Sequence, residues 1–203
     1  MSLGKREQKI DFLRLSFTLF AITAIVAMVL ALANYFTAPI IAEASKKRLD
    51  NSLRVLMADA KSFDEAIAYP EEIVTGGAKV PVAAVYQAKD AKGELMGYCV
   101  QVTPGGYSDV IDMIVAIDFN GAVSGVQILS ISDTPGIGMK VGSDQEFQDQ
   151  VLGMSEPATI VKSPATQKGE VQVISGASIS STAYFNGVNA AIDVAGQLLK
   201  EVE

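Results

Sequence analysis

The sequence lacks histidine altogether and contains a single cysteine, Cys99, among its 203 residues. Without imidazole side chains the chain cannot build a histidine-zinc site, a Ser-His-Asp triad or a Cys-His pair. One cysteine also excludes an internal disulfide bond or a cluster of thiolate ligands. Because Cys99 lies in the apolar run Tyr98-Cys99-Val100, we expect it to fill space in the core. No metal site is therefore predicted, and few hydrolytic reactions remain.

Basic residues are scarce in most of the chain. Residues 43–203 carry 12 basic and 21 acidic side chains, whereas residues 1–14 have a net charge of +2. A nucleic-acid partner is not expected, because phosphate backbones bind surfaces with clustered Lys and Arg. The acidic surplus is typical of a solvated surface.

Charge is absent from one long stretch near the N-terminus. Residues 15–42 contain no Asp, Glu, Lys or Arg, a run of 28 residues. A helix of about 20 apolar residues crosses the hydrocarbon core, whereas the apolar region of a cleavable signal peptide has only about 7–15. We therefore expect an uncleaved single-pass anchor in the lipid bilayer, with a transmembrane helix at 15–38 that Pro39 kinks or ends.

The charges on either side of the stretch bear on the orientation of this anchor. Four basic residues flank the uncharged stretch on each side, so the positive-inside rule does not decide between the two topologies. The short basic segment 1–14 is the natural cytoplasmic end, because long domains translocate regardless of their charge. We expect a protein of the cell (inner) membrane whose soluble domain lies on the extracytoplasmic side.

The rest of the chain predicts an α+β fold. Residues 39–66 favour a helical stalk, because apolar residues recur there at helical spacing. In the following domain, 67–203, Asn120-Gly121 predicts a hairpin turn with positive φ at both central positions. We expect a twisted antiparallel sheet with packed helices. Its strands are predicted at 80–88, 95–102, 110–118, 122–131 and 171–174, and its helices at 144–152, capped by Ser143, and at 180–202.

The most informative stretch is 173–182, where a strand ends, small residues follow and a helix begins. Free N–H groups and the helix dipole at such a junction attract an anion, above all a phosphate. Gly176 and Ala177 allow close approach, and hydroxyl groups add donors at Ser175, Ser178, Ser180, Ser181 and Thr182. A plain cluster of helix-capping residues is the alternative interpretation. A serine nucleophile is disfavoured, because no histidine can serve as its base.

Two glycine-rich loops are further candidates. In residues 132–140, Pro135 fixes φ, while Gly136 and Gly138 permit positive φ or close contact, so this loop could hold a flat ring. In residues 103–109, Tyr107 can contact an aromatic ligand. The alternatives are an ordinary turn and an ordinary surface loop.

Together these stretches resemble the FMN-binding G subunit of the Rnf electron-transport complexes and the related C subunit of the sodium-pumping NADH:quinone reductases. That family has a Glu-Thr-Pro-Gly-Leu-Gly loop followed by Ser-Gly-Ala-Thr near the C-terminus. Here the two motifs are Asp133-Thr134-Pro135-Gly136-Ile137-Gly138 and Ser175-Gly176-Ala177-Ser178. The single N-terminal span also fits, and the modest length favours the Rnf protein.

The resemblance implies covalent FMN, joined by a flavin transferase through a phosphoester to the last hydroxyl of the second motif. The matching residue is Ser178, where the family has threonine, and Gln172 stands where the family usually has aspartate. A bond through Thr182 or another hydroxyl, or a tightly held noncovalent flavin, are the alternatives. The predicted contacts of the cofactor are Tyr107, Thr134, Gly136, Ile137, Gly138, Ser175, Gly176, Ala177, Ser178, Ser181 and Thr182.

The resemblance further implies a flavoprotein that relays electrons within an ion-translocating ferredoxin:NAD oxidoreductase. Its partners would be the other membrane subunits of the Rnf complex, and the chain would have no turnover alone. The alternative functions are a membrane-anchored module that binds a phosphate-bearing ligand or flavin noncovalently, and a scaffold protein without a redox role.

Overall fold

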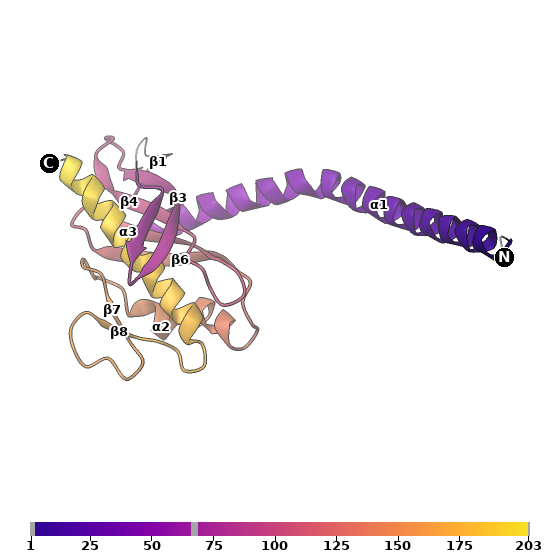
Figure 1. Ribbon diagram of the computed structural model, residues 1–203. Coiled ribbons are helices and arrows are strands. Elements are labelled where there is room, and N and C mark those ends of the chain that lie inside the picture. Colours follow the sequence, from indigo (N-terminus) through magenta and orange to yellow (C-terminus); the bar gives the residue numbers. More distant parts are fainter. Residues whose placement is uncertain (1–2, 66–68, 203) are drawn as a thin grey trace. The chain divides into compact units, whose positions relative to one another are not determined.

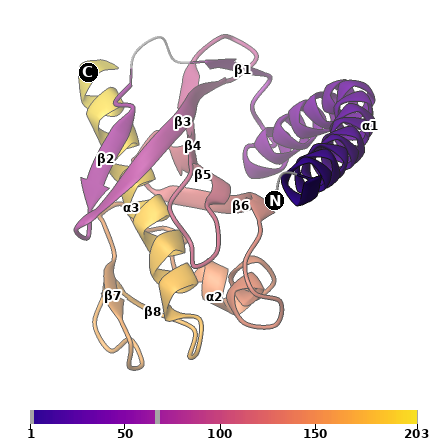
Figure 2. The same cartoon turned by 45° about the vertical axis from the view of Figure 1, so that its right-hand side comes forward.

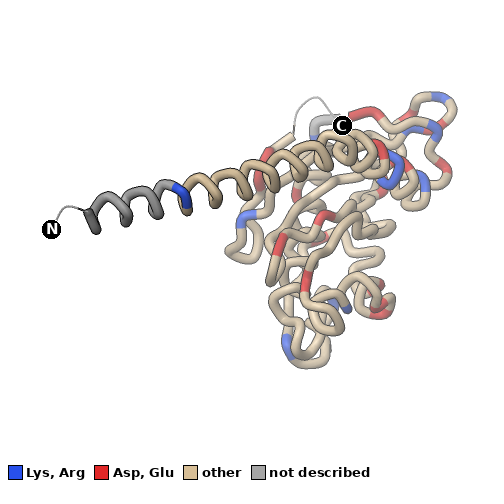
Figure 3. Tube along the Cα trace, turned by 90° about the vertical axis from the view of Figure 1, so that its right-hand side faces the viewer, with Lys and Arg blue, Asp and Glu red and all other residues tan. Residues whose placement is uncertain are grey.

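The computed structural model describes residues 3–65 and 69–202, which form two compact units, Met1–Lys47 and Arg48–Glu203. The first element, α1 (Leu3–Leu56), is one helix with Pro39 inside it (Figure 1). Pro39 was expected to kink or end the membrane span; the helix continues through it, and the ribbon of α1 curves. Within the described residues, one helix is long and apolar enough to cross a membrane, and it belongs to this segment. Figure 3 shows a long stretch of this helix in tan, without charged residues.

The predicted stalk is helical over a shorter range than expected. Helix α1 ends at Leu56, and Ser62–Glu65 form strand β1, so the helix does not continue to residue 66. Residues 66–68, which include the predicted boundary between stalk and domain, lie outside the described residues.

An antiparallel sheet forms the centre of the second unit. Its strands follow the order β1-β3-β4-β5-β6, and β2 also pairs with β3. A separate parallel pair joins β7 and β8. The α+β class is confirmed, whereas β1, β2 and β7 were not predicted. The strand bounds are β2 Glu72–Thr75, β3 Ala78–Lys89, β4 Leu95–Val102, β5 Ile111–Asp118, β6 Val123–Ile131, β7 Thr159–Val161 and β8 Glu170–Gln172.

Two local predictions need correction. In the β5–β6 turn only Gly121 has a positive φ, of 82°, because the Asp118 carboxylate accepts hydrogen bonds from the N–H groups of Asn120 and Ala122 and shapes a longer loop. Helix α2 (Gln145–Asp149) is capped by Asp144 rather than by Ser143, since the Asp144 side chain accepts from the N–H of Phe147.

Both faces of the sheet are covered. Helix α3 (Ser178–Val202) lies across one face of the sheet (Figure 2). Its buried residues share a core with Val85, Val100 and Val115. The last turns of α1 and the residues after it, including Leu53, cover the other face. Alternate strand residues supply the two cores, because side chains along a strand point to opposite faces.

Cys99 belongs to the core under α1 and is fully buried, as expected. Burial raises the pKa of its thiol to about 12, so the thiolate form is disfavoured at neutral pH.

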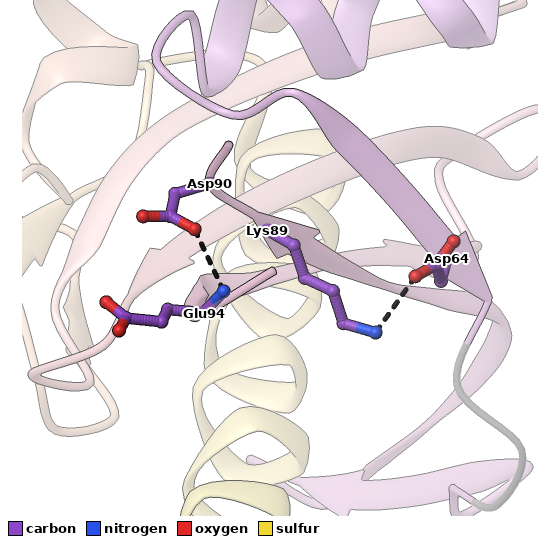
Figure 4. A network of polar contacts seen from close by, with 4 residues as sticks. All are labelled: Asp64, Lys89, Asp90 and Glu94. Carbon is purple, nitrogen blue, oxygen red and sulfur yellow. Dashed lines mark hydrogen bonds and ion pairs between the residues drawn. The ribbon is translucent and has the colours of Figure 1, made fainter. Parts of the chain in front are cut away.

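One edge of the sheet is fixed by polar contacts on its surface (Figure 4). Lys89 of β3 pairs with Asp64 of β1 at 2.9 Å, and the Asp90 carboxylate accepts from the N–H of Glu94 at 2.9 Å. The Asp90 contact defines the β3–β4 turn. Exposed ion pairs contribute little to stability, so these contacts set the register of the edge more than they stabilise the fold.

Candidate functional site

The N-terminus of α3 is built by a tight turn after β8. Gly176 adopts a φ of 83°, and the N–H of Ala177 donates to the carbonyl of Ile174 at 3.0 Å. The hydroxyl of Ser181 accepts from the N–H of Ile174 at 3.1 Å, which ties the turn to the helix. The first N–H groups of a helix have no acceptor within it, so the turn presents donors at Ser178 and the residues after it.

The loop after β6 turns back on itself. Gly136 has a φ of 75°, and the N–H groups of Ile137 and Met139 both donate to the carbonyl of Thr134. A 3-10 helix, η1 (Gly138–Gly142), follows directly. These contacts leave the Ile137 side chain half exposed.

The loop between β4 and β5 is closed by a hydrogen bond of 2.8 Å from the N–H of Gly106 to the carbonyl of Asp109. This closure leaves the Tyr107 side chain 66% exposed. An aromatic ring held in this way is available to a ligand or partner.

All three stretches meet at one cavity of about 500 Å³. The segments come from positions far apart in the sequence, and the fold brings them together at the start of α3. A cavity of this size is typical of small-molecule sites. Its lining residues are Tyr107, Asp133, Thr134, Ile137, Gly138, Gly176, Ala177, Ser178, Ile179 and Ser180.

A buried carboxylate connects the three segments. Asp133 is 6% exposed and accepts a hydrogen bond of 2.5 Å from the hydroxyl of Ser180. It also accepts from the N–H groups of Tyr107 at 3.4 Å, Ser108 at 3.1 Å and Thr134 at 3.3 Å. Burial by itself would raise the pKa of this carboxyl, but the hydrogen bonds together outweigh it and hold the pKa below its ordinary value of 3.8. Asp133 is therefore ionised at neutral pH.

The structure brings most of the predicted contacts to this cavity, but not all. Seven of the eleven line it: Tyr107, Thr134, Ile137, Gly138, Gly176, Ala177 and Ser178. Ser175 and Thr182 line two other cavities, and Ser181 is buried with its hydroxyl bonded to the turn. Gly136 is exposed and shapes its loop instead of lining the cavity.

Three further lining residues were not predicted as contacts. Asp133 was named only as part of the loop motif, and Ser180 only as one of the hydroxyl groups at the helix start. The hydrogen bond between them joins residues that are 47 positions apart in the sequence. The Ile179 side chain is 55% exposed. Its position as an apolar residue within a run of serines was the sequence feature that could have indicated a ligand contact.

Comparison with known proteins shows the family of this chain. Residues 106–193 match the FMN-binding domain family. The G subunit of the Na(+)-translocating ferredoxin:NAD(+) oxidoreductase complex of Acetobacterium woodii is 31% identical over 97% of this chain and 99% of its own length. The chain belongs to the G-subunit family of ion-translocating oxidoreductase complexes.

Two further proteins are similar to this G-type chain. The G subunit of the proton-translocating ferredoxin:NAD(+) oxidoreductase complex of Clostridium ljungdahlii is 27% identical over 82% of both chains. Among solved structures, NqrC of Shewanella oneidensis superposes with a TM-score of 0.46 at 16% identity, covering 71% of this chain and 73% of that one.

The cavity fits FMN in its size and donor set. Backbone N–H groups at the start of α3 suit a phosphate, and the exposed side chains of Tyr107, Ile137 and Ile179 suit a flat ring. Of the lining residues, Asp133 alone carries a charge, so none of them brings a positive one.

Proposed function

We propose that this chain is the membrane-anchored flavoprotein subunit of an ion-translocating oxidoreductase of the Rnf type, and that it relays electrons through FMN held at the start of α3. Family membership supports the assignment, and the convergence of three separate segments on one cavity supports the place of the cofactor. Bound FMN would supply the redox chemistry, and the protein would position it. The chain itself would have no turnover apart from its complex.

Ser178 is proposed as the point of covalent attachment, and the observation that carries this choice is the state of the five hydroxyls near the helix start. Ser180 and Ser181 are engaged in hydrogen bonds, while Ser175 and Thr182 line other cavities. Ser178 lines the cavity where the three segments meet, and its side chain makes no hydrogen bond within the described part of the chain. Its Oγ is therefore available to form a bond to phosphorus.

The electrostatics of the cavity favour a covalent link. A noncovalent site for a phosphate dianion usually has Lys or Arg, which the lining residues do not include. The helix dipole amounts to about half a unit charge and cannot balance both the dianion and Asp133. A phosphodiester at Ser178 carries one negative charge instead of two, and the bond replaces the missing cationic contacts.

Attachment requires a partner enzyme. A flavin transferase would use a flavin donor with a phosphoanhydride bond, which breaks as the bond from Ser178 Oγ to phosphorus forms. The hydroxyl proton is released with the departing phosphate group. Gly176, whose added Cβ would meet no atom within 4 Å, leaves the turn open to such an enzyme.

The roles of the other residues follow from their positions. The N–H groups at the start of α3 would hold the phosphate, while Thr134 and Gly138 would contact the ring through their loop. Tyr107, Ile137 and Ile179 would pack on the ring from the open side. The uncharged helix would lie in the lipid bilayer and keep the domain near the other membrane proteins of the complex.

The soluble domain is proposed to lie on the extracytoplasmic side. A C-terminal fusion to alkaline phosphatase, which is active only after export, should then be active in cells, and a fusion to cytoplasmic green fluorescent protein should stay dark. The opposite pattern of the two reporters would reverse this topology.

The function is tested by the flavin content of the full chain. The chain is produced with its flavin transferase, purified in detergent and separated on a denaturing gel. We expect a fluorescent band and an FMN-sized mass increment on the peptide that contains Ser178. Flavin that is released on denaturation would indicate the noncovalent alternative, and a chain without flavin would indicate the scaffold alternative.

A further inference from the structure

The Asp133 carboxylate sits in a space that two glycines create. A Cβ added at Gly138 would lie 2.6 Å from Cγ of Asp133, closer than real Cβ atoms come. A Cβ added at Gly106 would lie 2.6 Å from the carbonyl oxygen of Asp109 in the same loop and 3.3 Å from Oδ2 of Asp133. Gly138 belongs to the loop after β6 and Gly106 to the loop before β5, so a side chain at either position would crowd Asp133.

The hydrogen bonds of Asp133 run to each segment of the cavity wall. The N–H groups of Tyr107 and Ser108 reach it from one loop, the N–H of Thr134 from the second, and the hydroxyl of Ser180 from α3. Hydrogen bonds to a charged acceptor are stronger than neutral ones. Within the described residues, this is the one side chain that bonds to all three segments.

The same carboxylate is also the charged group of the cavity lining. A fixed negative charge near a redox centre opposes the addition of an electron, because reduction adds negative charge to the centre. With no cation among the lining residues, only the backbone N–H groups at the start of α3 act against this effect.

We propose that Asp133 is a positioning residue that fastens the Tyr107 loop and the Thr134 loop to the first turn of α3 and sets a negative charge beside the flavin. The electrostatic half of this inference rests on the proposed function, whereas the structural half does not. Removal of the carboxylate charge should therefore loosen two loops at once and make the flavin easier to reduce.

Three variants of the full chain test this inference. Asp133→Asn removes the charge with little change in size, and Asp133→Glu keeps the charge on a longer side chain. Asp118→Asn is the matched control, because Asp118 also accepts from two backbone N–H groups but does not line the cavity. Each variant is compared with the wild type by hydrogen exchange and, on the flavin-bearing fraction, by redox titration.

In Asp133→Asn we expect amide exchange in residues 103–110 and 132–140 to accelerate at least about tenfold, a fold-change that corresponds to about 1.4 kcal/mol of local stability. The flavin reduction equilibrium should shift at least about threefold toward the reduced form. Asp133→Glu should restore the potential toward the wild-type value, and Asp118→Asn should change neither signal in these segments.

Unchanged exchange in both segments of Asp133→Asn would overturn the positioning role. Faster exchange with an unchanged potential would overturn the electrostatic role, as would an equal potential shift in Asp118→Asn. A wild-type chain without flavin would contradict the proposed function, and the exchange data would still decide whether Asp133 fastens the loops.

Discussion

Replacement of Ser178 by alanine is expected to remove covalent flavin from the chain completely. Alanine has no hydroxyl, so no phosphoester can form at the proposed attachment point, the serine of the helix start that lines the cavity with an unbonded hydroxyl. The fold should be retained, because Ser178 is at the start of a 25-residue helix and its side chain makes no hydrogen bond within the described residues. In-gel fluorescence and peptide mass spectrometry measure the loss.

Two kinds of control separate this result from a general disturbance. Ser178→Thr keeps a hydroxyl at the same place and should keep the flavin. Ser175→Ala and Thr182→Ala remove neighbouring hydroxyls that line other cavities, and both should also keep it. Flavin that persists in Ser178→Ala but disappears in Thr182→Ala would move the attachment point to Thr182.

Replacement of Leu53 by alanine is expected to cost about 2–5 kcal/mol of the free energy of unfolding of the second unit, the range for a buried leucine. Leu53 is 3% exposed and packs with Met57 against Cys99 and Ile114 on the face of the sheet opposite α3. The last turns of α1 therefore contribute side chains to the core of the second unit, although the same helix contains the uncharged stretch.

The matched control is Val55→Ala, two residues along the same helix, where the side chain is 71% exposed. It should change the free energy of unfolding by less than about 0.5 kcal/mol. Urea unfolding followed by tyrosine fluorescence reports the transition, because Tyr98 and Tyr184 are buried in the second unit. Equal midpoints for the two variants would show that the end of α1 contributes nothing to the domain.

Strands β3 to β6 were predicted from the sequence because their apolar residues alternate and strong turn residues separate them. Strands β1, β2 and β7 were missed, since each is short and has little buried apolar surface to mark it. The end of α1 was misplaced because an amphipathic pattern does not show where a helix stops packing and a strand begins.

The residues of the candidate site also fall into those that the sequence predicted and those that it did not. Glycine and serine motifs were enough to mark Tyr107, Gly138 and Ser178, because such motifs shape loops and helix starts. The contact between Asp133 and Ser180 depends on the path of the chain through the intervening elements, which local patterns do not reveal. For the same reason Ser181 and Thr182 look equivalent to Ser178 in the sequence. The helix turns the Ser181 hydroxyl to the N–H of Ile174 and places Thr182 at another cavity.

The exposed side chains around the cavity have a consequence for chemical selectivity. Tyr107, Ile137 and Ile179 are each at least half exposed, so a ring resting on them would face open solution on one side. Dioxygen would reach the ring from that open side, where it would compete with a protein partner for electrons. The share of electrons that pass to the partner protein would then depend on whether its electron transfer is faster than the reaction with dioxygen. Oxidation of the flavin by dioxygen should increase when the partner is absent.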